Sequence, residues 1–342
     1  MKVLCINLPF RPLFINFAGI FERKMTQRTT EQLFRTPVKI AAPLCRMGVE
    51  DRFVFLGSCF AEHIGARFLE NCLQTIVNPL GVVYNPMSIV RLLEIHATES
   101  ERDFANREGM WHTWLGDSSL SRPSFADCEQ ATCVALKSLH DALLSADYLF
   151  LTLGTTHYYS YKGEVVANCH RFPAADFEEA EMEVGEMVTA MDHALVSWMS
   201  KNPHLKVVFT VSPYRYAKYG FHESQLSKAR LLLAVDELCH RHPDKVTYFP
   251  AYEIVLDELR DYRFYAEDML HPSSQAVQYI WQRLAESWMD QSVLDYLERW
   301  KPIHQALEHR PLNASDPAYE VFRQRTEVQL AALRKDYPFL PI

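Results

Sequence analysis

Long apolar runs and basic runs are both missing from this chain of 342 residues. No stretch approaches the roughly 18 consecutive apolar residues of a membrane-spanning helix, so we expect no membrane partner. No run is rich in lysine and arginine, and the net charge is −8, so the electrostatic footprint of a nucleic-acid-binding protein is missing too. There is no internal repeat and no low-complexity tract. With 48% hydrophobic and 23% charged residues, the composition is that of a globular protein.

Closely spaced cysteine pairs are absent as well. The chain has eight scattered cysteines, and none of them forms the C-x-x-C spacing of a zinc or redox site. A secreted disulfide scaffold would be shorter and denser in cysteine. We therefore expect reduced cysteines in a cytoplasmic protein, with no metal and no cofactor.

The N-terminal segment permits a second location. Residues 1–24 combine a charged start with apolar residues, but Arg11 and two prolines interrupt the apolar part, and no small-x-small cleavage site follows. Met25 opens a polar stretch that is a more natural start. We expect residues 1–34 to be a poorly ordered extension. If residues 1–24 are an export signal, the protein would be periplasmic.

What is present is an alternation of short apolar runs with longer segments of helical periodicity. Short runs rich in β-branched and aromatic residues are typical of parallel strands that are covered on both faces. Strands are expected at Phe53–Leu56, Tyr148–Leu153, Val207–Val211 and Val246–Phe249, and helices at Glu62–Asn71, Pro86–His96, Asp127–Ser145, Phe177–Met199, Ser224–His242 and Ser273–Met289. This alternation predicts an α/β protein, a three-layer α/β/α sandwich with a mostly parallel central sheet.

Three segments outside this alternation set the expected domain boundaries. Residues 97–126 are expected to be an insertion over one edge of the sheet, and residues 155–170 a hairpin that turns near Lys162 and Gly163. From Leu294 onward we expect two helices packed on the outside. The expected organisation is a catalytic domain over residues 35–290 and a helical extension over residues 291–342.

The stretch "FVFLGSCFAEHIG", residues 53–65, places two nucleophile-capable side chains in a turn between a strand and a helix. Backbone N–H groups at a helix start suit a developing oxyanion, so Ser58 is well placed for acyl chemistry. Late in the chain, Asp268 precedes His271 by three residues. This spacing lets the carboxylate orient an imidazole whose other nitrogen faces a serine. The alternative is a capping aspartate and a hydrogen-bonded loop histidine.

The order of these motifs resembles that of the SGNH/GDSL hydrolases. It is closer to that of the GSCFA family, whose name is spelled by Gly57–Ala61. The resemblance extends to "NPLGVVYNP" (78–86), "VSPYR" (211–215), "SQLSKA" (224–229) and "YAEDMLHPS" (265–273), and covers roughly residues 34–288. It implies an SGNH-like, flavodoxin-like fold and, by inference, hydrolysis.

The resemblance also implies roles for single residues. Ser58 would be the nucleophile, His271 the general base and Asp268 the residue that orients it. Gly81 falls where the SGNH pattern has its oxyanion glycine, with a backbone N–H free to reach the substrate.

A departure from the pattern follows the second expected strand. Related hydrolases usually have G-x-N-D there, whereas this chain has Gly154-Thr155-Thr156-His157. Thr156 would replace an asparagine amide by a shorter donor. Asn78 and Asn85 are the alternative sources of that donor.

Cys59 is the rival nucleophile. It shares the helix N-terminus, where the pKa of a thiol would fall. Adjacent residues at a turn point in different directions, so only one of the two side chains can face His271. The order of the motifs favours Ser58, with Cys59 packed underneath.

Further residues are candidates for the substrate pocket. His157 and His170 are expected to line it, and Arg215 would bind an anionic group or form a surface ion pair. His112, His157, His170 and Asp117 also allow a metal cluster, but no pair has the local ligand spacing of a zinc motif.

Two tryptophans in the insertion, Trp111 and Trp114, either stack on sugar rings or belong to the core. The resemblance, together with these aromatic residues, implies a serine hydrolase that cleaves an acetyl or short acyl ester of a small molecule or carbohydrate. Two alternatives remain: an acyltransferase with the same triad, and a non-catalytic carbohydrate-binding protein on the same scaffold.

Overall fold

The computed structural model describes residues 35–95, 102–311 and 317–341. The chain divides into two compact units, residues 1–37 and 38–342, and everything below concerns the second. The prediction for residues 1–34 lies outside the described residues. Within the described stretches, no helix combines the length and the apolar character needed to cross a bilayer.

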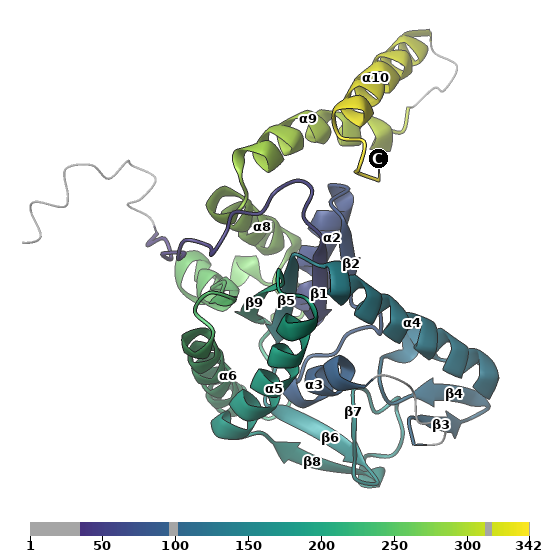
Figure 1. Cartoon of the computed structure of the whole chain (residues 1–342), viewed down its shortest axis with the longest axis vertical. Coiled ribbons are helices and arrows are strands. Elements are labelled where there is room, and N and C mark those ends of the chain that lie inside the picture. Colours follow the sequence, from purple (N-terminus) through teal and green to yellow (C-terminus); the bar gives the residue numbers. More distant parts are fainter. Residues whose placement is uncertain (1–34, 96–101, 312–316, 342) are drawn as a thin grey trace, which may run out of the picture. The chain divides into compact units, whose positions relative to one another are not determined.

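A five-stranded sheet lies at the centre of this unit (Figure 1). Its strands are β1 (Phe53–Gly57), β2 (Thr75–Val77), β5 (Tyr148–Leu153), β9 (Lys206–Val211) and β10 (Val246–Tyr248). They lie in the order β10-β9-β5-β1-β2, and all neighbouring pairs are parallel. The predicted parallel sheet is therefore confirmed. The order of the strands reverses between β1 and β5, and open α/β sheets place their ligands outside the carboxyl ends of the strands at such a point.

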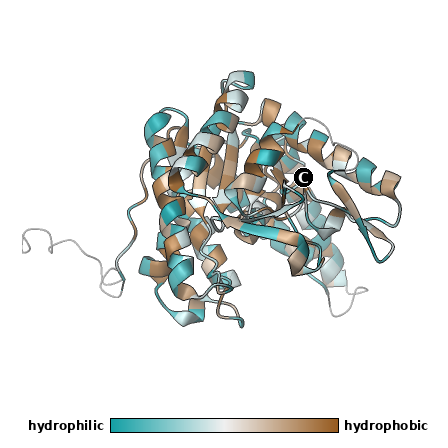
Figure 2. Cartoon of the chain, turned by 90° about the horizontal axis from the view of Figure 1, so that it is seen from below, coloured by the Kyte–Doolittle hydropathy of each residue, from teal (hydrophilic) through white to brown (hydrophobic). Residues whose placement is uncertain are grey.

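Side chains alternate along each strand between the two faces of the sheet. In β1, Val54 and Leu56 join an aliphatic core on one face, whereas Phe53 and Phe55 join an aromatic core on the other. The aliphatic face is covered by α3 (Pro86–Glu94), α4 (Phe125–Ser145), α5 (Val184–Lys201) and α6 (Phe221–Arg241). The aromatic face is covered by α2 (Cys59–Glu70), α8 (Ser274–Trp288) and α9 (Gln291–Glu308). Helices thus cover both faces, so the three-layer prediction is confirmed, and Figure 2 shows the central strands as mostly hydrophobic.

Two small antiparallel sheets flank the central one. The insertion forms the hairpin of β3 (Phe104–Arg107) and β4 (Met110–Thr113). The predicted second hairpin is present as β6 (His157–Tyr161) and β7 (Glu164–Val166), with Lys162 and Gly163 at positive φ in the turn. A further strand, β8 (Phe177–Glu181), pairs with β6.

The expected helix Phe177–Met199 is wrong in its first part. Residues 177–181 form β8, and α5 begins only at Val184 after the capping residue Glu183. The sequence "FEEAE" has residues that favour helices, but pairing with β6 brings Glu179 and Glu181 to His157. Here the tertiary context overrides local propensity. Strand β2 was not predicted, because three residues give too short a pattern.

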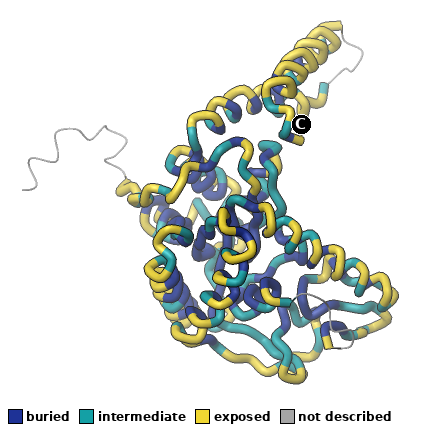
Figure 3. The backbone as a smooth tube through the Cα atoms, viewed as in Figure 1, coloured by how far each residue is buried: buried dark blue, intermediate teal, exposed yellow. Residues whose placement is uncertain are grey.

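The C-terminal helices attach to the aromatic face through α9. The Trp300 indole N–H donates to the Glu70 carbonyl oxygen, and the Tyr296 hydroxyl donates to that of Asn71, both at 2.9 Å. Helix α10 (Pro317–Asp336) is mostly exposed, as Figure 3 shows. Shorter helical turns cover Ser118–Leu120, Ala174–Asp176, Ala251–Glu253, Ile254–Leu259 and Tyr262–Phe264.

Candidate active site

The turn after β1 is fixed by a glycine and an asparagine. Gly57 has a φ of +148°, and a Cβ atom there would lie 2.4 Å from the carbonyl oxygen of Thr152, so only glycine fits. The Gly57 N–H donates to Asn78 Oδ1 at 2.8 Å, and Asn78 Nδ2 donates to the Gly57 carbonyl at 3.2 Å. Asn78 therefore holds the turn in place and is occupied by that task.

Ser58 follows directly as the N-cap of α2. Its Oγ accepts a hydrogen bond from the Phe60 N–H at 3.3 Å, and its own N–H donates to the Thr152 carbonyl at 3.1 Å. Only 4% of the residue is exposed. The hydroxyl thus lies at the positive end of the helix dipole, where negative charge on oxygen is stabilised.

The Asp268–His271 loop has the geometry of an oriented imidazole. Asp268 Oδ2 lies 2.5 Å from His271 Nδ1, while Oδ1 accepts the N–H groups of Leu270 and His271 at 2.9 and 3.0 Å. The hydrogen bond from the His271 side chain is the main cause that lowers the pKa of Asp268 to about 2. The carboxylate is therefore ionised at neutral pH and directs the second ring nitrogen, Nε2, away from itself.

Arg215 clamps this loop from the end of β9. Its N–H donates to the Leu270 carbonyl and its Nη1 to the Met269 carbonyl, both at 3.0 Å. The guanidinium lies over the rings of Phe221 and Tyr265, at 4.3 and 5.4 Å from their centroids. Among the described residues it forms no ion pair, so the expected surface ion pair is not found. Arg215 holds the histidine loop, and its binding of an anionic group stays a prediction.

The loops after β1 and β9 share one edge of the sheet, and their side chains approach each other there. The ring of Tyr214 lies 4.3 Å from that of His271. Burial and then the charges of Cys59 and Asp268 raise the pKa of Tyr214, while burial and then the charge of His271 lower that of His63 in α2. His271 therefore lies at the edge of the sheet where β9 ends, in contact with Tyr214. No hydrogen bond joins it to Ser58 in the part of the chain that the structure describes.

Two of the expected oxyanion donors, the Gly81 N–H and the Asn78 amide, are used elsewhere. The Gly81 N–H, which the resemblance leaves free, donates to the Asn78 carbonyl at 2.7 Å. Asn85 caps α3 by accepting the Ser88 N–H at 2.8 Å. The Cys59 N–H lies at the first position of α2, where no intrahelical acceptor exists. This N–H, rather than that of Gly81, is the available backbone donor next to Ser58.

Thr156 is also committed. Fully buried, its hydroxyl lies 2.6 Å from Glu181 Oε1 and 3.0 Å from Ser227 Oγ, and its N–H donates to the same Ser227 oxygen at 2.9 Å. Arg230 Nη1 donates to the same Glu181 oxygen at 2.6 Å. Thr156 thus connects the loop after β5 to β8 and α6.

The candidate pocket histidines have their direct contacts with segments other than the Asp268–His271 loop. His157 stacks on Tyr219 with ring centroids 4.0 Å apart. His170 is buried, its Nε2 lies 2.7 Å from the Thr113 carbonyl, and burial lowers its pKa to about 4. It stacks on His112 at 4.7 Å. Among the described residues, no three histidine, cysteine, aspartate or glutamate side chains gather in a way that would hold a metal ion.

Cys59 is a protonated, partly buried thiol. Burial, followed by the charge of Glu62, raises its pKa, so the expectation of a lowered pKa is wrong. Here desolvation outweighs the helix N-terminus. All cysteines of the described residues are free thiols.

Sequence reasoning missed Lys228. This lysine is only 2% exposed, and its Nζ donates to the carbonyl oxygens of Gly154 and Ser212 at 2.6 and 2.7 Å. These residues directly follow β5 and β9, so Lys228 joins two loops of the site. Burial lowers its pKa to about 7. A signal was available: Ser224, Ser227 and Lys228 precede Leu231 on one helical face, which places polar groups where a core helix needs apolar ones.

A cavity of about 430 Å³ was also missed. Tyr84 and Tyr216 line it with Asn168, Glu179 and Lys218. The Gly154 N–H donates to the Tyr84 carbonyl at 2.7 Å, and the ring centroids of Tyr216 and Tyr214 lie 6.0 Å apart. The cavity therefore adjoins the loops that carry the site.

Comparison with known proteins identifies the family. The model of the GSCFA family matches residues 52–284, and that of the GSCFA domain protein C-terminal domain matches residues 300–342. No curated protein matches the chain. A family two carbohydrate esterase from Clostridium thermocellum, solved in complex with cellohexaose, is 14% identical over 75% of this chain and 67% of that one, with a TM-score of 0.32. That score is too low to establish a shared fold. The family match covers well over half of the sequence, and the chain belongs to the GSCFA family.

Proposed function

We propose that this protein is a serine esterase that removes an acetyl or short acyl group from a carbohydrate. The observation that carries the proposal is the Asp268–His271 pair, joined at 2.5 Å and held by Arg215 in the loop after β9, a strand that runs parallel to the one that ends just before Ser58. A carboxylate, an imidazole and a serine in this order are the components of a hydrolase triad.

The first half of the reaction forms an acyl-enzyme. Ser58 Oγ turns from the Phe60 N–H towards His271 and attacks the ester carbonyl carbon while His271 Nε2 takes its proton. The carbonyl oxygen becomes an oxyanion. The N–H groups of Cys59 and Phe60 would receive it, because the first is at the helix start and the second loses its partner when Oγ moves.

Loss of the alcohol completes the acyl-enzyme: the His271 imidazolium gives its proton to the alcohol oxygen, and the C–O bond breaks. The second half releases the acid. Water then loses a proton to Nε2 and attacks the acyl carbon, and the carboxylic acid leaves as Ser58 regains its proton. Asp268 remains ionised throughout, in accord with its lowered pKa.

Labelling with a fluorophosphonate and hydrolysis of p-nitrophenyl acetate test the proposal. We expect wild type and Cys59→Ala to be labelled and to hydrolyse the ester. Ser58→Ala should not be labelled and should not hydrolyse it. Activity that survives in Ser58→Ala but not in Cys59→Ala would reassign the nucleophile. A wild-type protein that does not label would point to a binding protein, and acyl transfer to added sugars, followed by mass spectrometry, to an acyltransferase.

A further inference from the structure

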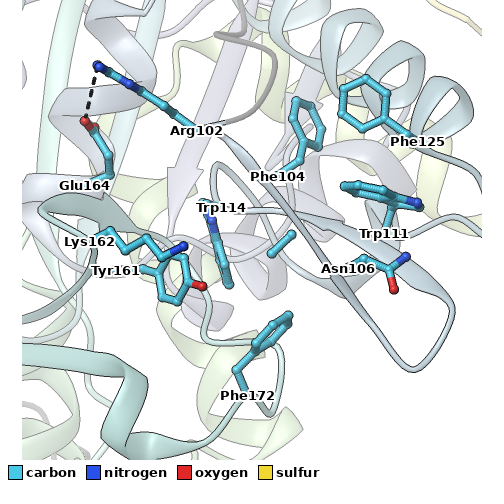
Figure 4. A pocket seen from close by; sticks show the side chains of 11 residues that line it. Arg102, Phe104, Asn106, Trp111, Trp114, Phe125, Tyr161, Lys162, Glu164 and Phe172 are labelled. Atoms are coloured by element: carbon cyan, nitrogen blue, oxygen red, sulfur yellow. Dashed lines mark ion pairs between the residues drawn. The ribbon is translucent and has the colours of Figure 1, made fainter.

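A large cavity lies between the hairpin β3–β4 and the hairpin β6–β7. Its volume is about 1070 Å³, which is at the upper end of the range for small-molecule sites. Figure 4 shows aromatic side chains around it. They form two groups, Phe104, Trp111 and Phe125 on one side and Trp114, Tyr161 and Phe172 on the other.

The aromatic groups hold each other in fixed orientations. The rings of Trp111 and Phe125 meet edge-on with centroids 5.0 Å apart. The ring centroid of Trp114 lies 4.9 Å from that of Tyr161 and 5.2 Å from that of Phe172. Trp111 is directly opposite Asn106 in the β3–β4 pair, so both side chains lie on the same face of the hairpin. The cavity thus presents rigid flat rings with an amide beside them.

Polar groups interrupt the aromatic wall. Asn106 and Lys162 are exposed, and Arg102 pairs with Glu164 at 4.0 Å (Figure 4). These groups would lose hydrogen bonds to water against an acyl chain, which makes a lipid a poor occupant.

Two buried donors in this region have no hydrogen-bond partner among the described residues. They are Nε1 of Trp114, in the wall of the cavity, and Nη1 of Arg107, whose guanidinium lies 5.6 Å from the Phe172 ring centroid. A buried donor without a partner costs about 1–3 kcal/mol, and such groups are rare in folded proteins. Both nitrogen atoms are closed off from solvent, so the polar groups that a ligand in the cavity meets are the exposed Asn106 and Lys162.

We infer that this cavity binds a carbohydrate. A sugar ring has an apolar face that stacks on aromatic rings and an edge of hydroxyl groups that pairs with Asn106, Lys162 and Glu164. Phe172 lines both this cavity and the one beside Tyr84, so one saccharide chain could extend from here to Tyr84 and Tyr216. The role as a substrate subsite rests on the proposed function, whereas binding itself needs no residue of the triad.

The test measures binding to the full chain carrying Ser58→Ala, so that no substrate is consumed. A printed array of plant and microbial glycans identifies the probe, and isothermal titration calorimetry measures its Kd. In the same background, Trp111→Ala and Asn106→Ala should each weaken binding at least tenfold. Asn106 is exposed, so its removal should leave the fold intact. The control is Phe322→Ala, which removes a partly exposed ring from α10 and should leave Kd unchanged.

Two results would overturn the inference: no glycan on the array is bound, or both cavity variants bind as tightly as the Ser58→Ala parent. Hydrolysis of p-nitrophenyl acetate separates this inference from the proposed function, because so small an ester does not need the cavity. Glycan binding without hydrolysis by wild type refutes the esterase and keeps the binding site. Hydrolysis without glycan binding keeps the esterase and refutes the binding site.

Discussion

The carboxylate of Asp268 holds both the ring and the backbone of His271. Oδ2 lies 2.5 Å from Nδ1, and Oδ1 accepts the His271 N–H at 3.0 Å. One side chain therefore fixes the orientation of the imidazole and the curvature of its loop. This double contact is what an orienting carboxylate requires, and it is equally present where a carboxylate caps a turn beside a hydrogen-bonded histidine, so activity measurements must separate the two.

The substitution Asp268→Asn should therefore impair catalysis more than folding. The amide that replaces the carboxylate can still accept a backbone N–H but no longer stabilises an imidazolium, and we expect kcat on p-nitrophenyl acetate to fall about 10²- to 10⁴-fold. The matched control is Glu267→Gln, the exposed neighbouring acid, which should change kcat less than about twofold. Equal effects of the two changes would contradict the assigned role.

Arg215→Met should slow the reaction by loosening the histidine loop. The variant loses the guanidinium bond to the Met269 carbonyl and the cation–π contacts, but it keeps the backbone bond to Leu270. We expect kcat to fall about 10- to 100-fold with KM nearly unchanged, since a small displacement of a catalytic group has effects of this size. Arg263→Met, an exposed arginine near the same loop, is the control. A rise in KM alone would mean that Arg215 binds the substrate.

Thr156 should matter for stability and little for turnover. Its hydroxyl is committed to Glu181 and Ser227, so Thr156→Val leaves buried partners without a bond and should lower the free energy of unfolding by about 1–3 kcal/mol. Loss of kcat should stay below about tenfold, less than for a working oxyanion donor. Urea titration and kinetics measure both, with Thr156→Ser as the control that keeps the hydroxyl. A hundredfold loss of kcat in a folded Thr156→Val would make Thr156 an oxyanion donor.

His170 should make stability depend on pH between about 6.5 and 4. Burial lowers its pKa from 6.5 to about 4, so in this window the unfolded state binds more protons than the folded one. Stability should therefore fall as the pH decreases, by about 3 kcal/mol in all. His170→Gln should remove this part of the slope in urea titrations, whereas His193→Gln, at an exposed position, should not. If the free energy of unfolding depended on pH in the same way in wild type and His170→Gln, the lowered pKa of His170 would be refuted.

The layers of the fold were predictable because apolar runs and helical periodicity are local signals. The run Tyr148–Leu153 is a central strand as predicted, and Ser58 and His271 lie at the same edge of the sheet because parallel strands end there. The strand Phe177–Glu181 was not predictable, because it is stabilised by pairing with β6, and the two strands are separated in the sequence by β7 and a loop.

The fine structure of the site was less predictable than the fold. The sequence shows that Gly81 and Thr156 are polar or flexible positions, but it does not show that Asn78 and Glu181 occupy their donors. Hydrogen-bond partners far apart in sequence depend on the finished packing. Lys228 was missed for the same reason, since the carbonyl groups that hold it are exposed only where two strands end.

Lys228 joins the loops after β5 and β9, and the second of these carries Tyr214 and Arg215. Lys228→Met removes the donors of two buried carbonyl groups, so the β9 loop should move and kcat should fall about 10- to 100-fold. Lys245→Met is the control, because this surface lysine also donates to a backbone carbonyl, that of Pro203. Its kcat should be that of wild type.

The pH dependence of stability separates this role from general damage to the fold. Burial lowers the pKa of Lys228 from 10.5 to about 7, so between these values the unfolded state binds more protons than the folded state. The stability of the wild type should therefore rise with pH across this window, because deprotonation removes a buried charge while the neutral amine still donates to Gly154 and Ser212. Lys228→Met cannot titrate and should lack this rise, whereas Lys245→Met should keep it. Unfolding in urea at pH 7, 8 and 9 would measure the difference. If the stability of Lys228→Met rose with pH as steeply as that of the wild type, the lowered pKa of Lys228 would be refuted.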